Sequence, residues 1–115
     1  MKYEKLRPNS VRIMGRNYVV LYEDDSLLGT ENLGLCNNQQ CMIIVKDGQH
    51  PVEEADTLLH EIFHAIWYCM TVATGGDDEE VIVRRMASGM MGVMLDNPKL
   101  LKYFQAIQNP PHLEL

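Results

Sequence analysis

The first half of the chain carries short apolar runs between polar interruptions, a pattern typical of strands and loops. Residues 1–16 are polar and broken by proline and glycine, so they are predicted to form an entry strand or loop. Residues 17–22 are rich in β-branched and aromatic side chains and stop at an acidic turn, which predicts the first clear strand. A loop with short extended pieces is expected over residues 27–41, followed by a second strand at residues 41–45 that ends at Asp47-Gly48.

In the second half the apolar residues recur at helical spacing. Pro51 and the acidic residues after it suit the first turn of a helix that is predicted from about residue 52 to about residue 71, before Gly75-Gly76. A second helix with an acidic start is expected from residue 77 to about residue 95, and a short third helix over residues 99–108. The order of these elements predicts an α+β fold, in which a small antiparallel sheet is followed by two or three helices.

Length and charge limit the classes of protein that this chain can represent. The 115 residues are expected to form a single domain, 1–115, with its core at about residues 17–108. The net charge of −6, with scattered basic residues, argues against nucleic-acid binding by phosphate neutralisation. No apolar run approaches the length of a membrane span, and the N-terminus lacks the apolar stretch of a secretory signal. The three cysteines, an odd number, fit a reducing compartment better than a disulfide scaffold. A cytoplasmic protein without membrane contact is therefore expected.

The segment with recognisable chemistry is His60-Glu61-Ile62-Phe63-His64, the pattern His-Glu-x-x-His. At about 100° per residue, His60 and His64 lie about 40° apart on one helix face, where both imidazoles can reach one metal ion. Glu61 lies beside them, able to contact a water without being a ligand. The opposite face of the same helix is apolar and predicted to be buried: Ala55, Leu58, Leu59, Ile62 and Ile66.

A catalytic zinc site usually has three protein ligands, so the pair of histidines needs a partner. Glu79 and Glu80 open the next helix, which a helical hairpin would bring back toward the histidines. Helical periodicity places Glu79 on the buried face of that helix and Glu80 at its edge, and a buried carboxylate is costly unless a cation neutralises it. Both glutamates remain candidates on this reasoning. His50 and His112 are expected to be a loop and a tail residue.

The segment from Thr57 to Trp67 resembles the active-site helix of small zincin metallopeptidase-like proteins of bacteriophages and prophages, related in style to the SprT-like and ImmA/IrrE-like groups. Residues 33–36 and 42–45 are similar to the loop and edge strand before that helix, and residues 80–90 with Asp96-Asn97-Pro98 resemble the glutamate helix and its closing turn.

The resemblance implies a minimal zincin-like fold, with a small antiparallel sheet, an active-site helix and a packed glutamate helix. It favours Glu80 over Glu79 as the third ligand, because a glutamate three residues before a valine recurs in the pattern. It further implies one zinc ion (Zn²⁺), and a peptide or protein substrate added along the strand at residues 42–45. Because no histidine lies between residues 65 and 111, the SprT-like pattern with a third histidine is a poorer match.

These observations predict a zinc metallopeptidase that hydrolyses peptide bonds with metal-activated water and Glu61 as general base. The alternative is a non-catalytic zinc-binding structural or protein-interaction module. Tyr68 is a candidate for stabilising the oxyanion, and Asp56, one turn before His60, either orients an imidazole or faces water. Cys36 and Cys41 are expected to be ordinary thiols. The methionines of the second helix are expected to belong mainly to the core.

Overall fold

The computed structural model describes residues 3–24, 28–29, 31–74 and 79–107. The 3-10 helix η1 and four strands come first, and three longer helices follow: η1 Tyr3–Leu6, β1 Ser10–Ile13, β2 Arg16–Glu23, β3 Gly34–Asn37, β4 Met42–Lys46, α2 Pro51–Thr74, α3 Glu79–Asp96 and α4 Pro98–Ala106. The predicted α+β class is confirmed, and each predicted strand and helix lies within a few residues of an observed one.

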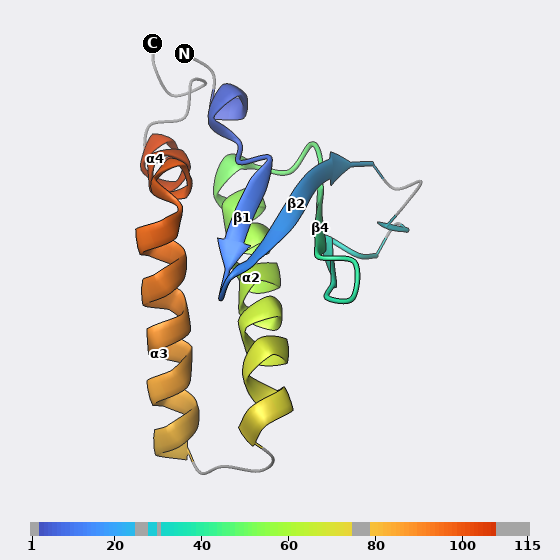
Figure 1. Ribbon diagram of the computed structural model, residues 1–115. Coiled ribbons are helices and arrows are strands. Elements are labelled where there is room, and N and C mark those ends of the chain that lie inside the picture. Colours follow the sequence, from blue (N-terminus) through green and yellow to red (C-terminus); the bar gives the residue numbers. More distant parts are fainter. Residues whose placement is uncertain (1–2, 25–27, 30, 75–78, 108–115) are drawn as a thin grey trace.

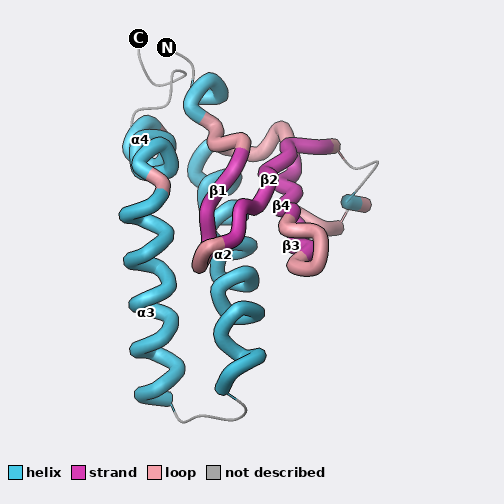
Figure 2. The backbone as a smooth tube through the Cα atoms, in the orientation of Figure 1, coloured by secondary structure: helices cyan, strands magenta, loops and turns pink. Residues whose placement is uncertain are grey.

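The four strands form one mixed sheet in the order β1-β2-β4-β3 (Figure 2). β1 pairs with β2 and β3 with β4 in antiparallel fashion, whereas β2 and β4 run parallel. The predicted purely antiparallel sheet is therefore wrong. The chain reverses direction twice between β2 and β4, once before β3 and once in the β3–β4 turn, and two reversals leave β4 parallel to β2.

The strand order also corrects the predicted substrate-binding edge. β4, which contains residues 42–45, is an inner strand between β2 and β3, so both of its backbone edges are paired. Its central residues Ile43, Ile44 and Val45 are buried, as expected for an inner strand. Within the described part of the chain, β3 is the edge strand on this side of the sheet.

One core joins the sheet to the helices. α2 contributes the apolar face predicted for it, with Leu58, Ile62 and Ile66 fully buried. Val11 and Ile13 of β1 are fully buried as well, so the hydrophobic core includes side chains ahead of residue 17. The sequence pattern of this strand was weak, because only two alternating apolar side chains of β1 face inward.

Helices α2 and α3 run side by side in opposite directions, and their lower turns extend past the sheet (Figure 1). They approach closely at Gly89, where an added Cβ would lie 2.7 Å from Cγ2 of Ile66. This contact sets which residues of the two helices lie level with one another.

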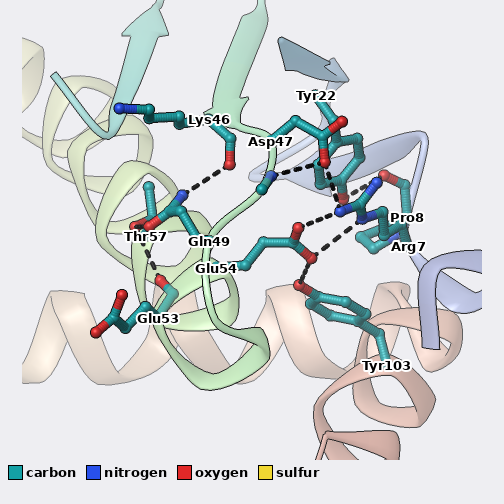
Figure 3. Close-up of polar contacts among 11 residues, drawn as sticks. Arg7, Pro8, Tyr22, Lys46, Asp47, Gln49, Glu53, Glu54, Thr57 and Tyr103 are labelled. Carbon is teal, nitrogen blue, oxygen red and sulfur yellow. Dashed lines mark hydrogen bonds and ion pairs between the residues drawn. The ribbon is translucent and has the colours of Figure 1, made fainter. Parts of the chain in front are cut away.

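A buried polar cluster joins η1 and α4 to the start of α2 (Figure 3). The fully buried Glu54 carboxylate accepts hydrogen bonds from Nε of Arg7 at 3.2 Å and from the Tyr103 hydroxyl at 2.5 Å, and it forms an ion pair with Arg7. Arg7 also reaches Asp47 at 2.9 Å. A carboxylate without exposure to water needs such partners, so this cluster fixes the first turn of α2.

Candidate metal centre

The two histidines of the His-Glu-x-x-His segment converge on one point at the surface of α2. Both side chains are exposed, and their Nε2 atoms are 3.1 Å apart. The ring centroids lie 4.7 Å apart and the ring planes meet at 76°. Two nitrogen ligands at 2.0–2.1 Å from a tetrahedral zinc ion would be separated by about 3.3 Å. The donor type, the exposure and the separation of His60 and His64 thus fit one shared ion.

Glu61 lies beside the pair but in a different environment. Its side chain is buried, with only 6% of the residue exposed, and burial raises the pKa of its carboxyl group. The neighbouring His60 and His64 act on that pKa in the opposite direction. Among the described residues, no hydrogen bond or ion pair engages the Glu61 carboxylate. A carboxylate held this way is a stronger proton acceptor than an exposed one.

The backbone of β3 passes directly against this carboxylate. An added Cβ at Gly34 would lie 2.8 Å from Cγ2 of Thr57 and 2.9 Å from Oε2 of Glu61. Glycine is therefore required at residue 34 for β3 to approach α2 this closely. From the sequence alone, Gly34 was expected in the loop and edge-strand segment, without this role.

The other edge of β3 faces away from β4. The carbonyl of Leu33 accepts a hydrogen bond from the Lys46 N–H at 2.8 Å, and Gly34 is opposite Val45 in the register. Because paired and unpaired positions alternate along an antiparallel ladder, the N–H and C=O groups of Gly34 and Cys36 point to the free edge. An added strand would thus bind close to Glu61.

The structure does not bring the predicted third ligand to the histidines. Both Glu79 and Glu80 are exposed, and Glu80 forms an ion pair with Arg84 at 3.6 Å. The α3 residue that lines a hollow with the histidines is Met86. Glu80 precedes Met86 by six residues, about 9 Å along the helix axis. Within the described residues, no group of three His, Cys, Asp or Glu side chains is arranged to hold a metal ion.

The predicted burial of Glu79 is also wrong, for a reason visible in Figure 1. The first turns of α3 extend past the sheet and run beside the last turns of α2, so the sheet does not cover them. Val83, one helical turn after Glu79, is likewise exposed. The buried residues of α3 are Gly89 and Val93, in its second half.

Other sequence candidates have different surroundings. The guanidinium of Arg16 lies 5.5 Å from the Tyr68 ring centroid, which gives this aromatic side chain a packing role at the surface of α2. Nδ1 of His50 accepts a hydrogen bond from the Val52 N–H, so His50 serves the start of α2. His112 lies outside the described residues. Asp56 is exposed and lines a cavity beside His60.

Cys36 and Cys41 are free cysteines, each partly buried. Burial, followed by the charge of Glu61, raises the pKa of Cys36 to about 11, which keeps this thiol protonated at neutral pH.

Sequence reasoning missed the cluster around Glu54. A signal was present, because Glu54 lies one helical turn before Leu58 on the apolar face of the first helix. Its partner Arg7 lies 47 residues upstream, and nothing in the sequence connects the two.

No helix among the described residues is long and apolar enough to cross a membrane. Comparisons of the chain with protein-family models, curated proteins and solved structures found no match. The functional assignment therefore depends on the geometry of this centre.

Proposed function

We propose that this protein is a zinc-dependent metallopeptidase, in which His60 and His64 hold one zinc ion and Glu61 is the general base. The observation that carries the proposal is the convergence of two exposed histidines, with Nε2 atoms 3.1 Å apart, beside a glutamate that is only 6% exposed. Burial raises the pKa of Glu61, and an acid with a raised pKa beside two metal-type ligands supports a chemical role for this group.

The zinc ion would supply a Lewis acid that activates water and polarises the peptide carbonyl. Glu61 then accepts a proton from the attacking water on its carboxylate and passes it to the departing amide nitrogen. The raised pKa of Glu61 suits both steps, because the group must first take up a proton and then release it. His60 and His64 keep their Nε2 lone pairs free for the ion, which requires the ring proton on Nδ1.

The substrate backbone is proposed to bind along β3 rather than along residues 42–45. The free N–H and C=O groups of Gly34 and Cys36 offer the hydrogen bonds of an added strand. Because Gly34 packs against Glu61, a peptide bound there would pass close to the base.

Substitution of Glu61 by Gln tests this function directly. The Glu61→Gln variant should keep its fold and its bound zinc, and its rate of peptide hydrolysis should fall by about 100-fold or more. Glu53→Gln is the matched control, because Glu53 is an exposed glutamate of the same helix. Hydrolysis is measured on a synthetic peptide library by mass spectrometry. Equal rates for wild type and Glu61→Gln would refute Glu61 as the base.

A second candidate is a zinc-binding module without catalysis, which meets a protein partner through this face. It is favoured by the presence of only two suitably placed histidines in the described structure, where catalytic sites usually have three ligands. The exposed Phe63 and Trp67 beside the histidines would suit a partner. Zinc binding by wild type without hydrolysis of any library peptide would favour this candidate.

A further inference from the structure

Two hollows of opposite character flank the histidines. The first, of about 350 Å³, lies between α2 and the segment that enters β3, and His60 and Glu61 form part of its wall. The second, of about 290 Å³, is lined by His60, Phe63, His64, Trp67 and Met86. His60 borders both, so a peptide that crosses the histidines would place neighbouring side chains in different surroundings.

The first hollow is acidic. Glu31, Asp56 and Glu61 all line it, and no lysine or arginine does. Glu61 is more than nine-tenths buried, and its carboxylate has no hydrogen-bond partner among the described residues. Since no fully buried side-chain oxygen of the described residues lacks a partner, the Glu61 carboxylate oxygens keep some exposure, and Glu61 lines this hollow together with Glu31 and Asp56.

Two side-chain donors of the same wall, Thr57 and Asn32, already have partners. The Thr57 hydroxyl lies within hydrogen-bond distance of the Glu53 carbonyl at 2.9 Å and of Oε1 of Gln49 at 3.1 Å. Nδ2 of Asn32 donates to the Leu28 carbonyl at 2.8 Å. The three carboxylates of the wall complement a ligand that brings both positive charge and hydrogen-bond donors.

The second hollow is apolar and aromatic. Phe63 and Trp67 remain 42% and 45% exposed, large values for such side chains, and Met86 adds a flexible apolar wall from α3. This surface suits a large apolar side chain.

We propose that the acidic hollow is a specificity pocket for a lysine or arginine side chain, and that the aromatic hollow takes a large apolar residue on the other side of the cleaved bond. This inference rests on the proposed peptidase function and names its substrate class. Asp56 and Glu31 are the specificity-determining residues, since Glu61 is reserved for the chemistry.

The test uses N-acetylated decapeptides that contain Lys-Phe or Phe-Lys at the centre, with norleucine or glutamate replacing the lysine in matched sets. Cleavage by the zinc-loaded protein is followed by mass spectrometry. Binding to the chelator-treated protein is followed by fluorescence anisotropy, so that recognition is measured without hydrolysis. The variant is Glu31→Gln/Asp56→Asn, and its control is Glu53→Gln/Glu79→Gln, which removes two exposed charges outside both hollows.

We expect one of the two lysine peptides, Lys-Phe or Phe-Lys, to bind about tenfold more tightly than the matched peptide with norleucine. The same lysine peptide should be cleaved about tenfold more efficiently than its norleucine counterpart. The double variant should lose both preferences, and the control should keep them. Cleavage without preference for lysine, or a preference that survives in the double variant, would overturn the pocket while leaving the peptidase function intact.

Preferential lysine binding without any cleavage would support the pocket and refute the peptidase function. A norleucine peptide with a free N-terminus that binds as tightly as the lysine peptide would show that the pocket recognises an α-amine, which contradicts the assignment to a side chain.

Discussion

Substitution of Gly34 by alanine adds one methyl group at the contact between β3 and α2. The new Cβ would lie 2.8 Å from Cγ2 of Thr57, and 2.9 and 3.2 Å from Oε2 and Cγ of Glu61. Thr57 cannot turn away easily, because it is buried and its hydroxyl interacts with Glu53 and Gln49. Either β3 moves outward or Glu61 changes its conformation.

The structure sets the size of both effects. A methyl group forced into a packed contact typically costs about 1–3 kcal/mol of unfolding free energy. Misplacement of the general base by about 1 Å can lower the catalytic rate about 100-fold. Zinc binding should change little, because the three atoms nearest to the new Cβ belong to Thr57 and Glu61 and not to the exposed histidines.

Two other glycines serve as controls. Gly89→Ala places a Cβ 2.7 Å from Ile66, so it should destabilise the α2–α3 contact by a similar amount without touching Glu61. Gly92→Ala meets no atom within 4 Å and should stabilise α3 by up to about 1 kcal/mol.

Urea denaturation gives the unfolding free energy, and peptide hydrolysis at a temperature where all variants are folded gives the rate. A Gly34→Ala protein as stable and as active as wild type would refute the close packing of β3 on Glu61. A Gly89→Ala protein that loses as much hydrolysis as Gly34→Ala would show that the rate reports stability rather than the position of the base.

Three further predictions concern the buried groups. Arg7→Ala should lower the unfolding free energy by about 3 kcal/mol, because it leaves the buried Glu54 carboxylate without its cation. Urea denaturation at pH 7 measures the loss, and a loss below about 1 kcal/mol would contradict this role of Arg7. The pKa of Tyr103 is raised, chiefly by burial and then by its contact with Glu54, so the unfolded chain loses the phenolic proton at lower pH than the folded chain does. The unfolding free energy, measured by urea denaturation, should therefore fall as pH rises above about 10. In Tyr103→Phe the fall should be smaller, and a fall as large as in wild type would be inconsistent with this cause. With a pKa of about 11, Cys36 should react slowly with iodoacetamide at pH 8. Glu61→Gln should speed this reaction, because it removes a nearby negative charge. An unchanged rate at Cys36 would argue against the proximity of Cys36 and Glu61.

The helical half of the fold was predictable because its signals are local. The stripe of Leu58, Ile62 and Ile66 fixes the buried face of α2, and the same stripe fixes the opposite face for His60 and His64. Glu61 follows from the motif, but its contact with Gly34 depends on how β3 packs against α2, which no local pattern encodes.

The sheet was predicted less well because strand order is not local. Residues 42–45 form a strand as expected, but whether that strand lies inside or at the edge depends on the path of the chain between β2 and β4. Glu79 was misplaced for a related reason, since the apolar periodicity of α3 continues past the end of the sheet that would bury it.

The most direct test of the account is a zinc titration of the purified protein and of His60→Ala, His64→Ala and Glu80→Gln variants, with bound metal measured after removal of free zinc. We expect one zinc ion per wild-type chain, loss of zinc binding in both histidine variants and unchanged zinc binding in Glu80→Gln. Absence of zinc from the wild-type protein, or retention of zinc by His64→Ala, would contradict the central claim that the two imidazoles share one metal ion.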